Sequence, residues 1–206
     1  MHLPSIAALC LTCASMASAV CVTQEMVETI APKSKECPPS MLPECRTAAE
    51  AAPYITRAFH RYGIYNPNAM ASVMALMALE SGEFQYKRNA FPGRPGQGTA
   101  NMQMAEFNLK YAKSIGRLEP RVANVTTVDR QSDTELNRIL DLVVADDYNF
   151  GSGAWFLRSE CGEKVLSALN EDVDAGFAAH MDCVGVEADN EERQAYLTLA
   201  KQAFDL

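Results

Sequence analysis

The chain has 206 residues, which is enough for one domain with a full hydrophobic core. It carries 18 basic and 26 acidic side chains, so its formal net charge is −8 and its isoelectric point lies near 4.9. An acidic chain is a poor electrostatic match for nucleic acid or an anionic membrane, and we expect neither as a partner.

The first 19 residues have the pattern of a secretory signal peptide. An apolar run from Leu3 to Met16 is followed by Ala17-Ser18-Ala19, the small residues that signal peptidase accepts. At roughly 14 residues this run is short for a membrane span, which needs about 20. Cleavage before Val20 would remove 19 of the 206 residues and leave 187. We therefore expect a secreted, extracellular protein, and we expect it to be a monomer.

Residues 20–45 form a Cys/Pro-rich segment, which predicts an irregular N-terminal arm held by disulfides. Five cysteines remain after the signal peptide, and in a secreted chain most of them should be paired. They are Cys21, Cys37, Cys45, Cys161 and Cys183. Two bridges and one odd cysteine allow fifteen arrangements. Proximity in the sequence favours Cys37 with Cys45 and Cys161 with Cys183, which leaves Cys21 over.

Residues 46–206 predict a single, mostly α-helical domain. Apolar residues recur at helical spacing from Cys45 up to Gly63, and Pro53 should bend or split this first helix. Asn66 is a good N-cap and Pro67 suits the first position of the next helix. That helix is apolar on all sides until Glu80, so we expect it to be buried at the centre of the domain.

Further helical patterns follow as far as the C-terminus. They cover residues 101–115, 131–145, 147–160, 162–170, 172–181 and 188–204. The run from Val122 to Val128 is the only strand-like candidate. Within it begins an N-glycosylation sequon at Asn124, which predicts a surface loop.

Glu80 is the candidate catalytic residue. Its side chain leans over Leu76 and Met77, and the negative end of the helix dipole lies beside it. Apolar surroundings and the dipole both favour the protonated form of a carboxyl group. Such an acid suits glycosidic cleavage, in which the leaving oxygen must be protonated. The simpler alternative is a Glu that ends a helix and points to water.

A Gly/Pro-rich loop follows Glu80 and leads to two amide side chains. Asn101 and Gln103 carry donors and acceptors that suit sugar hydroxyls, although both amides could instead bond to their own backbone. Tyr86 and Arg94 could line the same groove. The three glycines at the end of the loop are followed by no Lys-Ser/Thr pair, so a phosphate cradle is the poorer interpretation.

These residues resemble the lysozyme-like superfamily. The order Glu80-Ser81-Gly82, Gly98 and then Asn101-Met102-Gln103 is similar to the core of lytic transglycosylases and goose-type lysozymes. The segment NFGSGAWFL at 149–157 resembles a helix of that family that begins Asn-x-x-x-Gly-Ala. The segment FPGRPGQGTANMQM at 91–104 resembles secreted fungal lysozyme-like proteins.

The resemblance implies a lysozyme-like fold and a secreted glycosidase that needs no cofactor and no metal. Its substrate would be a β-1,4-linked amino-sugar polymer, with peptidoglycan of the cell wall first and chitin or chitosan second. Glu80 would be the general acid, and the substrate would be bound by Ser81, Tyr86, Gly98, Asn101 and Gln103. The alternative is a non-catalytic carbohydrate-binding or effector protein on the same scaffold.

The family's second functional groups are not evident in this chain. The usual supporting Tyr is missing; His180 lies in that region, where a core residue is the simpler interpretation. Trp155, in a helical pattern, is likewise expected in the core. An inverting hydrolase also needs a second carboxylate, about 6.5 to 9.5 Å from the first. Candidates are Glu83, Glu106, Asp129, Asp133, Asp146 and Asp147.

Overall fold

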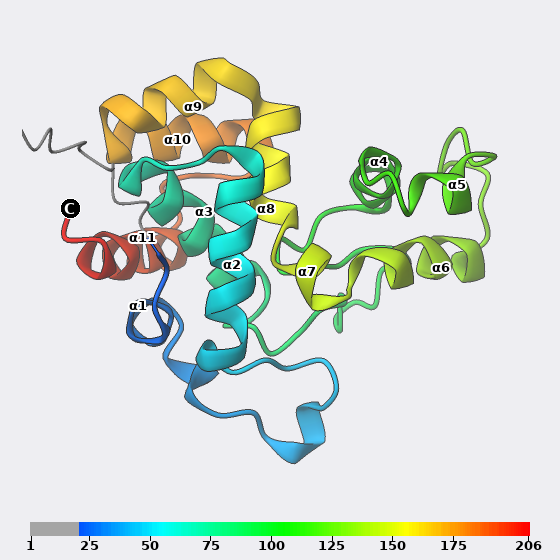
Figure 1. Cartoon of the computed structure of the whole chain (residues 1–206), viewed down its shortest axis with the longest axis horizontal. Coiled ribbons are helices and arrows are strands. Elements are labelled where there is room, and N and C mark those ends of the chain that lie inside the picture. The colour runs from blue at the N-terminus through cyan, green and yellow to red at the C-terminus, as the bar shows by residue number, and fades with distance from the viewer. Residues whose placement is uncertain (1–20) are drawn as a thin grey trace, which may run out of the picture.

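The structure, a computed structural model, describes residues 21–206, so the predicted signal peptide lies outside the described residues. Over this range the chain is α-helical, and its only β pairing consists of two isolated bridges, Arg88 with Gly98 and Gly98 with Gln103. The prediction of one mostly α-helical domain is confirmed (Figure 1).

Most of the helices are joined by short connections, whereas a long loop joins α3 to α4. In chain order they are α1 (Gln24–Ile30), η1 (Pro32–Lys35), η2 (Pro39–Met41), α2 (Ala48–Tyr62), α3 (Pro67–Glu80), α4 (Ala105–Ser114), α5 (Glu119–Val122), α6 (Asp133–Val143), α7 (Asp146–Asn149), α8 (Ser152–Phe156), η3 (Leu157–Cys161, a π-helical turn), α9 (Gly162–Glu171), α10 (Val173–Val184) and α11 (Glu191–Ala203). Among these residues no helix combines the length and the apolar character needed to cross a membrane.

Helix α3 is the centre of the larger part of the molecule. It begins as predicted, because the Asn66 side chain accepts a hydrogen bond from the Asn68 amide and Pro67 occupies the first turn. Every residue from Ala69 to Ala78 is buried. Helices α8, α9, α10 and α11 pack against it (Figure 1). The expectation of a central buried helix is therefore confirmed.

A second apolar cluster joins α4, α5 and α6 to the end of α8, beside the body around α3 (Figure 1). Trp155 belongs to this cluster, is 3% exposed, and lies with its ring centroid 4.8 Å from that of Tyr111. It is a core residue, as expected. The fold thus has two apolar clusters, one around α3 and one around Trp155.

The cysteines pair as predicted. Cys37 and Cys45 are bonded within the N-terminal segment, and Cys161 at the end of η3 is bonded to Cys183 in α10. Cys21 is exposed and free. The first bridge closes a loop of the arm, and the second ties the π-helical turn to the helix that packs beside it.

The expectation of an irregular arm over residues 20–45 is only partly right. The arm contains α1, which begins where the Thr23 side chain accepts a hydrogen bond from the Met26 amide. Val27 and Ile30 are fully buried, and the helix packs against α2 and α11. Val27 and Ile30 are three residues apart, so they lie on one face of this short helix and anchor it to the core. The prolines dominate the composition of the segment, which is why the sequence predicted an irregular arm.

Three other local predictions need correction. Pro53 does not split the first helix, because α2 runs through it from Ala48 to Tyr62. The strand-like run Val122–Val128 forms no strand, because Val122 ends the short helix α5, which has Pro120 in its first turn, and the following residues form a turn and a loop. The helical pattern predicted over 147–160 is divided into α7, α8 and η3.

Candidate functional site

Glu80, the last residue of α3, lies between two adjoining cavities. Their volumes are about 300 Å³ and about 270 Å³, and Glu80 and Met102 line both. Helix α3 is buried from Ala69 to Ala78, and Glu80 at its C-terminal end is partly exposed. We call the two cavities together the Glu80 groove.

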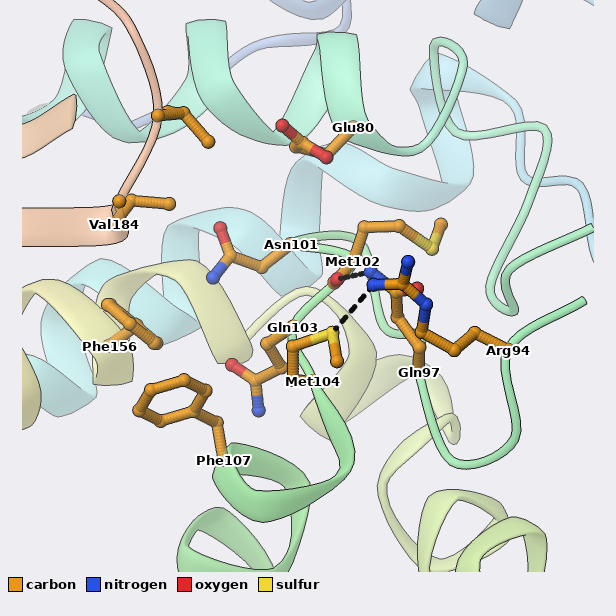
Figure 2. Close-up of a pocket in the computed structure, with 12 residues that line it drawn as sticks. Glu80, Arg94, Gln97, Asn101, Met102, Gln103, Met104, Phe107, Phe156 and Val184 are labelled. Atoms are coloured by element: carbon orange, nitrogen blue, oxygen red, sulfur yellow. Dashed lines mark hydrogen bonds between the residues drawn. The ribbon is translucent and has the colours of Figure 1, made fainter. Parts of the chain in front are cut away.

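The larger cavity has an apolar wall assembled from three helices. Phe107 comes from α4, Phe156 from α8 and Val184 from the end of α10. The two phenylalanine rings meet edge to face, with centroids 4.8 Å apart. Figure 2 shows the rings and Val184 along one side of the opening. A ligand that fills this cavity would cover apolar surface, which favours binding by about 25 cal/mol per Å² removed from water.

The polar side of the groove comes from the loop between α3 and α4. Thr99 and Met102 adopt left-handed backbone conformations, with φ values of 67° and 45°. The amide of Gly98 donates to the carbonyl of Gln103 at 3.1 Å, which closes the segment between them into a compact turn. The turn presents the side chains of Asn101 and Gln103 to the opening (Figure 2).

Asn108 fixes the orientation of Gln103. The fully buried Asn108 amide donates to the carbonyls of Gly96 and Gln103, at 2.8 and 3.2 Å. Its oxygen accepts from Nε2 of Gln103 at 2.9 Å. This hydrogen bond fixes the Gln103 amide, so its oxygen Oε1 points away from Asn108. Gly96 also needs to be a glycine, because a Cβ there would lie 2.8 Å from that of Ala105.

Two buried amide oxygens in the groove have no hydrogen-bond partner among residues 21–206. They are Oδ1 of Asn101 and Oε1 of Gln103, on side chains of residues that are 6% and 5% exposed. A buried acceptor without a donor costs roughly 1–3 kcal/mol. The groove therefore offers two buried acceptors to any ligand that carries a hydroxyl or N–H donor.

Glu80 is ion-paired, which its sequence neighbours do not reveal. Arg193 of α11 donates from a guanidinium nitrogen to Oε1 of Glu80 at 2.9 Å. The two side chains are 24% and 15% exposed, Glu80 being the more open. The expectation of mainly apolar surroundings for this carboxylate is therefore wrong, since a cation from a helix 113 residues further along the chain lies against it.

Of the predicted groove residues, the structure brings Glu80, Asn101 and Gln103 to the larger cavity. Arg94 lines it too, with a guanidinium nitrogen 3.6 Å from the sulfur of Met104. Tyr86 lies in the smaller cavity.

Ser81 and Gly98 were also predicted to bind substrate, but both serve the fold. The Ser81 hydroxyl is fully buried, donates to the carbonyl of Met77 and accepts from the amide of Phe84. A Cβ on Gly98 would lie 2.4 Å from the carbonyl oxygen of Lys87, so close packing requires glycine there. Neither residue lines the groove.

The carboxylates considered as partners of Glu80 are engaged elsewhere or exposed. Glu83 is 4% exposed and accepts hydrogen bonds from the Lys33 amide at 2.6 Å and the Tyr196 hydroxyl at 2.8 Å. Asp147 pairs with Arg57. Neither lines the groove, and the same is true of Glu106, Asp129 and Asp133, which are exposed.

Asp146 is held between two cations. It accepts from Nζ of Lys87 at 2.5 Å and from Nε of Arg46 at 2.9 Å. Burial alone would raise the pKa of Asp146, but these two hydrogen bonds outweigh it and the pKa lies below its usual value. This carboxylate joins the loop after α3 to α7 and to the segment before α2.

His180 is a core residue, as the simpler interpretation predicted. It is 1% exposed on α10, and its Nδ1 lies 2.8 Å from the hydroxyl of Ser72 on α3. Burial lowers the pKa of His180 to about 4. Among residues 21–206 no three His, Cys, Asp or Glu side chains are grouped so that they could hold a metal ion.

Comparison with known proteins finds a fungal relative. The chain is 51% identical over 167 residues to a protein of Fusarium oxysporum (strain Fo5176) described as a bifunctional dioxygenase–epoxy alcohol synthase. The match covers 81% of this chain but only 13% of that protein. No family model matches the chain, and no solved structure matches it.

This relative overturns the resemblance to the lysozyme-like superfamily. The predicted muramidase or lytic transglycosylase activity, and the carbohydrate-binding alternative on that scaffold, are therefore wrong. The structure gives a physical reason why the motifs misled. The Ser of Glu80-Ser81-Gly82 closes a turn and Gly98 avoids a steric contact, so packing within this chain explains both residues without implying a particular reaction.

Proposed function

We propose that this domain binds an amphipathic small molecule with hydroxyl groups in the Glu80 groove. The observation that carries the proposal is the pair of unpartnered amide oxygens on Asn101 and Gln103, which face a cavity with an apolar wall. Both oxygens accept hydrogen bonds only, so the complementary group on the ligand is a donor such as a hydroxyl. The apolar remainder of the ligand would pack against Phe107 and Phe156.

The relative's name suggests which class of molecule to test first. An epoxy alcohol has one hydroxyl donor, one ether-like epoxide oxygen and a hydrocarbon chain. The hydroxyl suits the oxygen of Asn101, and the epoxide oxygen suits the guanidinium of Arg94, which has only donors. Because the chain spans 13% of the relative, the activity of that whole protein is carried over only as this choice of ligand.

Calorimetric titration of the purified chain with a straight-chain epoxy alcohol tests the proposal. A second ligand, identical except that hydrogen replaces the hydroxyl group, removes the donor. We expect saturable binding of the alcohol and binding roughly 2- to 13-fold weaker without the hydroxyl, the range that one neutral hydrogen bond provides.

Asn101→Ala is the variant that separates this hydrogen bond from general apolar binding. It should weaken binding of the alcohol by the same factor and leave binding of the ligand without a hydroxyl unchanged. Asn124→Ala, at an exposed loop position away from the groove, is the matched control. Failure of the alcohol to bind, or equal affinities for wild type and Asn101→Ala, would refute the proposal.

A further inference from the structure

A separate cavity carries positive charge in this acidic protein. It has a volume of about 690 Å³ and lies between α2, the turn that follows α4, and α7. Arg57, Arg61 and Arg117 line it, with Asp147 as the one carboxylate among its lining residues. Three guanidinium groups against one carboxylate leave a local charge of +2, whereas the whole chain has −8. We call this space the arginine cavity; it shares no lining residue with the Glu80 groove.

Pairing within the protein does not account for the charge. Arg57 pairs with Asp147 at 3.1 Å, but Arg61 and Arg117 have no carboxylate within 4.0 Å among the described residues. Elsewhere five arginines, Arg46, Arg88, Arg138, Arg158 and Arg193, are each paired with an acidic side chain. The other arginines without an acidic partner among the described residues do not line this cavity; they are Arg94, Arg121 and Arg130. Gathering unpaired cations in one concave place is unfavourable for folding, because like charges repel. An anion bound there would offset that repulsion.

Two of the arginines are held in place by tyrosine rings. The guanidinium carbon of Arg117 lies 4.9 Å from the ring centroid of Tyr148, and its Nε donates to the hydroxyl of the same tyrosine. Tyr148 is only 4% exposed, so it is a rigid support. The guanidinium carbon of Arg57 lies 4.4 Å from the ring centroid of Tyr54. A guanidinium that stacks on a ring by its face still has N–H donors free for a ligand. Because the side chain is already ordered, binding a ligand costs less side-chain entropy.

Two hydroxyl groups, those of Tyr62 and Ser114, also belong to the wall. Burial raises the pKa of Tyr62, so its hydroxyl stays neutral at physiological pH. Arginine is the side chain best suited to phosphate and carboxylate, because its planar fork donates two parallel hydrogen bonds. A local charge of +2 favours a doubly charged anion over a singly charged one. We propose that the arginine cavity binds the phosphate group of a small organic phosphate, whose organic part rests against Tyr62 and Tyr148.

Titration of the purified chain with inorganic phosphate and with phenyl phosphate, at constant ionic strength, tests this site. We expect saturable binding of both ions, with phenyl phosphate the tighter because of its ring. Arg61→Gln and Arg117→Gln should each weaken phosphate binding by roughly 10-fold or more, as expected for loss of a charge-assisted hydrogen bond. Arg117→Lys keeps the charge but loses the fork, so its affinity should fall between those of wild type and Arg117→Gln.

Arg130→Gln is the matched control, since Arg130 is exposed, lies outside the cavity and has no carboxylate partner among the described residues. It removes the same charge from the chain and should leave phosphate binding unchanged. Arg61 is exposed and makes no ion pair among residues 21–206, so Arg61→Gln should fold like the wild type. Absence of saturation up to about 10 mM phosphate, or equal losses in Arg61→Gln and Arg130→Gln, would overturn the proposal.

Discussion

Glu80 and Arg193 join the end of the central helix to α11 through an ion pair of 2.9 Å. Both side chains are less than a quarter exposed, so the pair is shielded from water more than most surface pairs. A pair in this setting is expected to contribute measurably to stability, because removal of one partner leaves the other charge poorly solvated.

A double-mutant cycle with Glu80→Gln and Arg193→Gln measures this contribution. We expect a coupling energy of about 1–3 kcal/mol from urea unfolding, within the range for contacting residues. The control cycle uses Asp174→Asn and Lys201→Gln, a pair 2.8 Å apart whose aspartate is 62% exposed. Exposed pairs contribute about 0–1 kcal/mol. Equal coupling energies in the two cycles would contradict the stabilising role inferred for Arg193.

Gly98 should not tolerate a side chain. The methyl group of Gly98→Ala would lie 2.4 Å from the carbonyl oxygen of Lys87 and 2.8 Å from a methyl carbon of Leu140. We expect a loss of about 1–3 kcal/mol in the free energy of unfolding, as is usual for overpacking. Gly116→Ala is the control, because nothing lies within 4 Å of its added carbon. If thermal unfolding shifts equally in both variants, the loop geometry described around Gly98 is incorrect.

Protonation of His180 should couple stability to pH. Burial lowers its pKa to about 4, whereas the unfolded chain has the ordinary value of about 6.5. Between these values the unfolded state binds a proton that the folded state does not. The free energy of unfolding should therefore be highest above pH 6.5 and fall as the pH drops toward 4, by up to about 3 kcal/mol.

The variant His180→Gln tests this pH dependence in urea unfolding from pH 7 to pH 4.5. Glutamine retains a polar group for Ser72 but does not titrate, so the variant should lack the part of the slope due to His180. It is expected to be less stable than the wild type at pH 7 and closer to it at pH 4.5. Parallel curves for the two proteins would rule out a buried, neutral His180.

The sequence was most informative where local chemistry decides the structure. The bounds of α3 follow from Asn66 and Pro67 at its start and from an apolar run that ends at Glu80, and each of these signals acts on the backbone next to it. The same holds for the disulfides, because both bridges close short loops. Helix α1 was missed because its stability comes from Val27 and Ile30 packing against distant helices.

Of the residues that line the groove, those close together in the sequence could be predicted. Asn101 and Gln103 follow Glu80 within one loop, so their common location could be inferred. Arg193 could not, because nothing near residue 193 indicates that its guanidinium lies against a carboxylate 113 residues earlier. Phe107 and Phe156 occur in helical patterns that are also typical of core residues, and only the packing of α4 beside α8 places them in a groove wall.

The contacts of α11 give this helix a second role besides covering the core. Arg193 donates a hydrogen bond to Glu80, the last residue of α3. One turn later in α11, Tyr196 donates a hydrogen bond to Glu83, which lies in the turn after α3. A small displacement of α11 would thus loosen both carboxylates together. Through these two contacts the position of the C-terminal helix is linked to the end of α3 that lines the groove.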